Sequence, residues 1–129
     1  MAARIFLGFS ALLWLPYGLF CFFQPSYLAE VAGVAATPPT GTIELRAMYG
    51  GLEAALGVLA GLALFRPQLL RPALVTLAFV CSGLFLARLL GAGLGRELSS
   101  YTAFGLAFEL VSAALASWLL AHEPGPAVA

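Results

Sequence analysis

The sequence predicts an all-α, polytopic membrane protein folded as an antiparallel bundle of four transmembrane helices. Of its 129 residues, 62% are hydrophobic and 9% are charged, whereas soluble domains are about 45–50% apolar and about a quarter charged. The charged residues are six Arg and six Glu, with neither Lys nor Asp. Four apolar stretches are each long enough, at ~20 residues, to cross the ~30 Å hydrocarbon core of a bilayer.

The composition also excludes two classes of protein. A formal net charge of zero without any Lys leaves little to neutralise phosphates, so we expect no nucleic acid among the partners. The high hydrophobicity excludes an intrinsically disordered chain. The partner that the composition does indicate is the lipid bilayer itself.

The first span is expected at residues 5–23, which contain no charged residue. A cleavable signal peptide is the alternative, with Arg4 before the apolar stretch and small residues at 33–36 after it. The stretch exceeds the usual ~7–15 apolar residues of a signal peptide, which favours a retained helix. Residues 24–43 contain several Pro and Gly and are expected to form a connecting loop.

Three further spans are expected, at residues 44–65, 72–90 and 101–121. Prolines between the second and third spans mark a short turn, and the glycine-rich segment after residue 90 marks the next connection. Thr42 is the expected N-cap of the second span, and Ser99 or Ser100 that of the fourth. With a Pro- and Gly-containing tail at 122–129, the whole chain 1–129 is expected to be a single membrane domain.

The distribution of Arg gives an orientation. With the N-terminus inside, Arg4, Arg66 and Arg71 lie on the cytoplasmic side and Arg96 lies outside, as the positive-inside rule favours. We therefore expect a multi-pass protein of the inner (cytoplasmic) membrane with both termini in the cytoplasm.

Four charged residues lie within or at the edge of the spans: Arg46, Glu53, Arg88 and Glu109. A charged side chain at mid-membrane costs about 2.5–3.5 kcal/mol on insertion scales, so these residues must be paired or hydrated. From the rise of a helix, Glu53 and Glu109 both lie ~12–13 Å below the outer ends of their spans. Arg46 and Arg88 lie just above that level, which predicts two guanidinium groups over two carboxylates.

The same helix faces carry small residues. In the second span, Arg46, Tyr49 and Glu53 share a stripe with three glycines, Gly50, Gly57 and Gly61. In the fourth span, Gly105 accompanies Glu109. Because small residues allow helix backbones to approach closely, we expect these two stripes to face each other.

Two interpretations of the charged set remain open. It is either a buried ion-pair network that fixes helix register, or a polar pocket or proton site with Tyr49 as a further donor. A carboxylate between two Arg should stay ionised, which favours anchoring a ligand headgroup over proton cycling.

Catalytic, metal and cofactor motifs are not found. Cys21 and Cys81 lie within spans, far from any His, so we expect neither a metal site nor a disulfide framework. The glycine-rich segment 91–95 lacks the preceding strand of a phosphate-binding loop. We therefore expect no cofactor and no enzymatic activity.

The segment Glu44-Leu45-Arg46-Ala47-Met48-Tyr49-Gly50-Gly51, followed by Leu86-Ala87-Arg88-Leu89 and Phe108-Glu109-Leu110, resembles the bacterial domain-of-unknown-function family 4345. The resemblance covers residues 44–121. It implies a small protein with four membrane helices, points to Arg46, Arg88 and Glu109, and supplies no reaction. One departure is Ala87, where the family usually has Gly. The overall plan is also similar to DoxX-like four-helix membrane proteins, at the level of the fold alone.

Taken together, the sequence predicts a protein that binds a small ligand, such as a lipid or quinone-like molecule, or that serves as an accessory subunit. The charged pocket is expected in the outer half of the bilayer. A homo-oligomer or a larger membrane complex is possible for either role. The alternative is an oligomeric proton- or cation-coupled transporter of small molecules.

Overall fold

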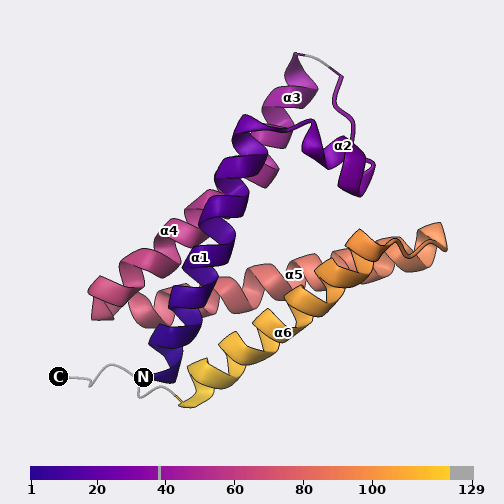
Figure 1. The fold of residues 1–129 in the computed structure, drawn as a ribbon. Coiled ribbons are helices and arrows are strands. Elements are labelled where there is room, and N and C mark those ends of the chain that lie inside the picture. Colours follow the sequence, from indigo (N-terminus) through magenta and orange to yellow (C-terminus); the bar gives the residue numbers. More distant parts are fainter. Residues whose placement is uncertain (38, 123–129) are drawn as a thin grey trace.

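The structure, a computed structural model, describes residues 1–37 and 39–122, and every regular element in these residues is helical (Figure 1). In chain order the elements are α1 (Ala2–Phe23), α2 (Tyr27–Ala32), α3 (Thr40–Leu45), the π-helical turn η1 (Arg46–Gly51), α4 (Leu52–Phe65), the 3-10 turn η2 (Pro67–Leu69), α5 (Leu70–Gly95) and α6 (Ser100–His122).

The described residues contain four helical stretches that are long and apolar enough to cross a membrane. They are Ala2–Phe23, Thr40–Phe65, Pro67–Gly95 and Ser100–His122. The second stretch combines α3, η1 and α4, and the third combines η2 and α5. These stretches confirm the predicted all-α four-helix architecture of a multi-pass membrane protein.

Several boundaries differ from the sequence-based expectation. The second span begins at Thr40, so Thr42 lies inside α3 and does not cap it. The third span continues through the glycine-rich segment and ends at Gly95, because glycine is tolerated in membrane helices. Arg96, the residue after it, adopts the left-handed conformation with φ 51°. Ser99 does cap α6, since its Oγ accepts a hydrogen bond from the Thr102 amide at 3.1 Å. From residue 123 onward, the predicted tail lies outside the described residues.

The helices form two antiparallel pairs, α1 with α4 and α5 with α6 (Figure 1). The pairs meet at the end where α1 begins and α6 ends. The apolar core lies toward this closed end and takes small and branched residues from all four spans. Its most buried members include Leu7, Ala60, Leu74, Leu77 and Ala116. At the same end, Arg71 Nη1 donates to the Leu120 carbonyl at 3.3 Å.

Toward the other end the two pairs diverge, and the connection between the first two spans lies there (Figure 1). This connection was expected to be a loop, but it contains the short helices α2 and α3. Leu28 of α2 is fully buried, and the Tyr27 ring meets the Phe20 ring edge-on, with centroids 5.0 Å apart. The connection is therefore packed against the diverging end of the bundle.

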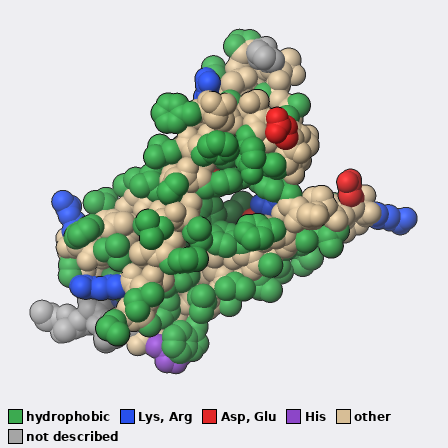
Figure 2. Space-filling view, in the orientation of Figure 1, with side chains coloured by type: hydrophobic (Ala, Val, Ile, Leu, Met, Phe, Trp, Pro, Cys, Tyr) green, Lys and Arg blue, Asp and Glu red, His purple; other side chains and the backbone are tan. Residues whose placement is uncertain are grey.

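Apolar side chains are spread along both helix pairs on the face that Figure 2 shows, and the few charged side chains there lie mainly toward the ends of the helices. Large residues such as Phe9, Phe79 and Leu94 are well exposed on the helices. In water such a surface would promote aggregation, whereas in a bilayer it faces lipid tails.

Candidate functional site

A cavity of about 620 Å³ occupies the space where the two helix pairs diverge. Figure 2 shows it as a hollow between the two arms, with blue and red atoms inside. Its lining comes from α1, α2, η1, α4, α5 and α6. The charged side chains among the lining residues are Glu53, Arg88 and Glu109. We call this space the main cavity.

Arg88 and Glu109 form a forked ion pair between α5 and α6. Arg88 Nε donates to both carboxylate oxygens of Glu109, at 3.0 and 3.1 Å, and Nη2 donates to Oε1 at 2.7 Å. The Glu109 side chain is only 4% exposed, while that of Arg88 is 27% exposed. Bidentate geometry of this kind gives the strongest side-chain hydrogen bonds. The pair therefore joins the two helices and neutralises both charges.

Glu53 occupies a different position in the same cavity. Its Oε2 atom is buried and has no hydrogen-bond partner within the described part of the chain. A buried polar atom of this kind is costly unless something satisfies it. Glu53 Oε2 is thus a hydrogen-bond acceptor in the main cavity that no described protein atom uses.

Arg46 does not join the other three charges, contrary to the expected arrangement. Its Nε donates to the Phe22 carbonyl at 3.1 Å, and its guanidinium carbon lies 6.0 Å from the centre of the Phe22 ring. The physical reason is the π-helical turn η1, in which the Leu52 amide bonds to the Ala47 carbonyl five residues earlier. The extra residue in this turn rotates the preceding residues about the helix axis, so Arg46 faces the end of α1.

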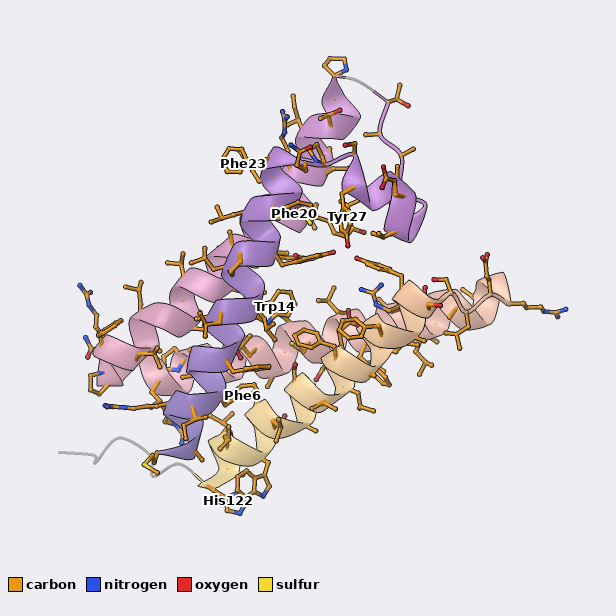
Figure 3. All side chains as sticks on the ribbon, viewed as in Figure 1. Phe6, Trp14, Phe20, Phe23, Tyr27 and His122 are labelled. Carbon is orange, nitrogen blue, oxygen red and sulfur yellow. The ribbon has the colours of Figure 1, made fainter. Side chains whose placement is uncertain are left out.

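Aromatic side chains form much of the cavity wall. Trp14 projects from α1 into the space between the pairs (Figure 3), and its ring lies 5.6 Å from that of Phe108. Phe104 stacks on Phe108 with centroids 6.4 Å apart. This wall was not predicted. The spacing of Phe104 and Phe108 beside Gly105 and Glu109 places them on one helical face and could have indicated it.

The two helix pairs are also bridged at the diverging end. The hydroxyls of Tyr17 in α1 and Tyr101 in α6 lie 3.0 Å apart, within hydrogen-bonding distance. The guanidinium carbon of Arg88 lies 5.9 Å from the centre of the Tyr101 ring. Tyr27 of α2 points toward the same space (Figure 3) and lines the cavity. Tyr49, a predicted donor, lines it as well.

The predicted packing glycines contact other neighbours than expected. A Cβ at Gly50 would lie 2.7 Å from Phe22 Cβ, and one at Gly57 would lie 2.6 Å from Leu15 Cβ. One at Gly61 would lie 3.8 Å from Ala11 Cβ. All three neighbours belong to α1, so this stripe packs against the first span.

The expectation that the glycines of the second span face the fourth span is therefore wrong. The fourth-span glycine has its own role. A Cβ at Gly105 would lie 2.8 Å from Arg88 Nε. Gly105 thus leaves room for the guanidinium beside Glu109.

A second space, of about 490 Å³, adjoins Arg88 on the side of α2. Its lining includes Gly33 after α2, Gly91 and Gly95 of α5, and Thr102 of α6. Arg88 lines both this side recess and the main cavity. The guanidinium therefore stands between the two spaces.

The two cysteines and the histidine of the chain lie on three different helices, α1, α5 and α6. Cys21 and Cys81 are buried free thiols. His122 Nδ1 lies 2.7 Å from the Trp118 carbonyl at the far end of α6. Within residues 1–37 and 39–122, no group of three or more His, Cys, Asp or Glu side chains could hold a metal ion.

Comparison with known proteins gives one match. The model of a family described as "Domain of unknown function (DUF4345)" matches residues 2–120. The match confirms the family that residues 44–121 indicated and extends it over the first span. No curated protein and no solved structure matches the chain.

Proposed function

The chain belongs to the family of the domain of unknown function DUF4345, and since that description names no activity, we propose from the cavity that it binds a small, largely apolar molecule. The single observation that carries this proposal is the main cavity of about 620 Å³, with aromatic walls and the unsatisfied Oε2 of Glu53. Ligand sites in proteins typically have ~300–1,000 Å³ and a few convergent polar groups on apolar walls.

The size and chemistry of the cavity favour an amphipathic ligand. Trp14, Phe104 and Phe108 offer flat apolar surface, and Glu53 offers a hydrogen-bond acceptor. A lipid headgroup region or a small ring compound with one polar substituent would match both parts. The spans are exposed to lipid, so such a molecule can reach the site from the bilayer.

The orientation remains the one that the Arg distribution favours. We place the closed end of the bundle, with the Arg66–Arg71 turn, at the cytoplasmic face of the inner membrane. The main cavity then opens toward the outer half of the bilayer. In a variant with Cys21 and Cys81 replaced by Ser, maleimide applied from outside intact cells should label Arg96→Cys and not Arg4→Cys.

The test of binding is native mass spectrometry of the protein released from nanodiscs that retain cellular lipids. We expect the wild type to keep a discrete small mass that Glu53→Gln loses. This variant keeps the side-chain size and removes no described hydrogen bond of Oε2. Glu44→Gln is the matched control, because Glu44 is an exposed carboxylate of the same span. A bare wild-type protein, or equal retention by all three proteins, would contradict the proposal.

A transporter is the second candidate, and the same carboxylate favours it. Glu53 lies in a space that is open where the helix pairs diverge and closed by the apolar core at the other end. Proton- or cation-coupled transport would use such a carboxylate in alternating exposure. Uptake into proteoliposomes driven by a pH gradient, and abolished in Glu53→Gln, would favour this role. A flux independent of both pH and cation gradients would exclude it.

A further inference from the structure

We infer that the ligand of the main cavity carries an ammonium group, a protonated amine on an apolar frame, which binds at Glu53. This inference rests on the proposed function and names the class of ligand that the cavity takes. It follows from three features of the site: its charge, its unsatisfied acceptor and its aromatic walls.

The charge of the site is the first feature. With Arg46 turned toward Phe22, the charged side chains among the described lining residues are two carboxylates and one guanidinium. The forked hydrogen bonds between Arg88 and Glu109 neutralise one charge of each sign. The carboxylate of Glu53 remains, and a cation compensates it at the lowest cost in a medium of low dielectric constant.

The second feature is the direction of hydrogen bonding. An ionised carboxylate only accepts hydrogen bonds, so Glu53 Oε2 needs a donor. The hydroxyls of Tyr17 and Tyr101 already bond to each other, and Nε and Nη2 of Arg88 bond to Glu109. Neither Arg88 Nη1 nor the hydroxyls of Tyr27 and Tyr49, which also line the cavity, form a hydrogen bond with Glu53 Oε2. An ammonium group supplies up to three N–H donors together with the positive charge.

The third feature is the wall around this position. Trp14, Tyr49, Phe104 and Phe108 all line the cavity. Aromatic faces attract cations through the ring quadrupole, and Arg88 already lies over the Tyr101 ring at 5.9 Å. An anionic ligand would instead be repelled by the Glu53 carboxylate. The cation that could bind such a ligand, Arg88, is already paired with Glu109.

The experiment uses three probes on one rigid frame: 1-aminoadamantane, 1-adamantanol and 1-adamantanecarboxylate. At pH 7 the amine is a cation, as the Lys side chain is, the alcohol is a neutral hydrogen-bond donor, and the carboxylate is an anion. Binding is measured by equilibrium dialysis against the protein in phosphatidylcholine nanodiscs, with empty nanodiscs subtracted. We expect the amine to bind the wild type at least about tenfold more tightly than the alcohol, because hydrogen bonds to charged groups are the stronger ones. The carboxylate should bind most weakly.

Glu53→Gln should remove the advantage of the amine over the alcohol, and the matched control Glu44→Gln should retain it. Equal binding of the three probes, or an amine advantage that survives in Glu53→Gln, would overturn the ammonium assignment. If no probe binds the wild type, the assignment is likewise overturned. The proposed function is judged separately, by the retained mass in native mass spectrometry, which uses none of these probes.

Two sources could supply the ammonium: a free amine, or the headgroup of a phosphatidylethanolamine lipid. Repeating the dialysis in nanodiscs that contain phosphatidylethanolamine distinguishes them. Competition that weakens amine binding to the wild type, beyond any change in empty nanodiscs, identifies the lipid headgroup as the ligand. Unchanged binding identifies a free amine.

Discussion

Replacing Arg88 by Met should destabilise the protein more than replacing Glu109 by Gln, although the two residues share the same hydrogen bonds. Arg88→Met leaves the Glu109 carboxylate without its partner, and the Glu109 side chain is only 4% exposed. Glu109→Gln leaves the Arg88 guanidinium, whose side chain is 27% exposed and also borders the side recess. The guanidinium can therefore turn toward water, whereas the carboxylate cannot.

The magnitudes follow from this difference in burial. Removing one partner of a buried pair costs about 3–5 kcal/mol, which we expect for Arg88→Met. Losing a hydrogen bond to a charged group that can rehydrate costs about 1.5–3 kcal/mol, which we expect for Glu109→Gln. In the double variant no unpaired charge remains. It should therefore be more stable than Arg88→Met alone, which requires a coupling free energy larger than the cost of Glu109→Gln by itself.

The assay is unfolding by sodium dodecyl sulfate in dodecyl maltoside micelles, followed by tryptophan fluorescence. Trp14 lies 5.6 Å from Phe108, one residue before Glu109, so its emission should report loss of packing near the ion pair. All four proteins of the cycle are measured under the same conditions.

Additive effects in the double variant, with a coupling below about 0.5 kcal/mol, would refute the account of the pair as one energetic unit. The opposite order, with Glu109→Gln the more damaging variant, would refute the assignment of the buried and the rehydratable partner.

Three further predictions concern the packing of the second span on α1, the hydrogen bond between Tyr17 and Tyr101, and the position of Arg46 outside the main cavity. Gly57→Ala should lower the free energy of unfolding by about 1–3 kcal/mol in the same assay, because its Cβ would overlap α1. The control Gly83→Ala, whose Cβ has open space, should leave the free energy of unfolding unchanged or raise it by up to about 1 kcal/mol. Equal effects of the two substitutions would contradict the α1–α4 contact. Tyr17→Phe and Tyr101→Phe should each lower the free energy of unfolding by about 0.5–1.5 kcal/mol, and the double variant should lower it no further, since the two hydroxyls share one hydrogen bond. Additive effects would argue against that hydrogen bond. Arg46→Gln should leave the mass retained in native mass spectrometry unchanged, and its loss would place Arg46 in the site.

The architecture was predictable because the bilayer imposes strong constraints on sequence. A span needs ~20 apolar residues whose backbone hydrogen bonds are satisfied within the helix, and four such stretches can be read directly from the sequence. The ends of the spans were harder to predict. Glycine marks a turn in soluble proteins but is common in membrane helices, and α5 therefore continues to Gly95.

The candidate site was predictable in part. Rise per residue placed Glu53 and Glu109 at one level, and the structure brings both to the main cavity with Arg88 and Tyr49. Arg46 was misplaced because helical periodicity assumes 3.6 residues per turn, and η1 interrupts that period between Arg46 and Glu53. A π-helical turn has no reliable sequence signal, so its effect on facing could not be anticipated.

The divergence of the two helix pairs could not be predicted either. Periodicity shows which face of each helix is small or polar, but not which neighbour that face meets. The glycines of the second span could have packed on any helix, and they pack on α1. This contact holds α1 and α4 together, and the side of the second span that carries Glu53 then faces the cavity.

The central claim, that a small molecule occupies the main cavity in the membrane, is tested most directly by photo-crosslinking in native membranes. A benzophenone amino acid replaces Phe108, which lines the cavity, or Phe79, which is 78% exposed on the outer surface of α5. After irradiation, intact-mass analysis should show a discrete small-molecule adduct at position 108 and only the general spectrum of membrane lipids at position 79. Crosslinks from position 108 to protein alone, or an adduct spectrum identical to that of position 79, would contradict the account.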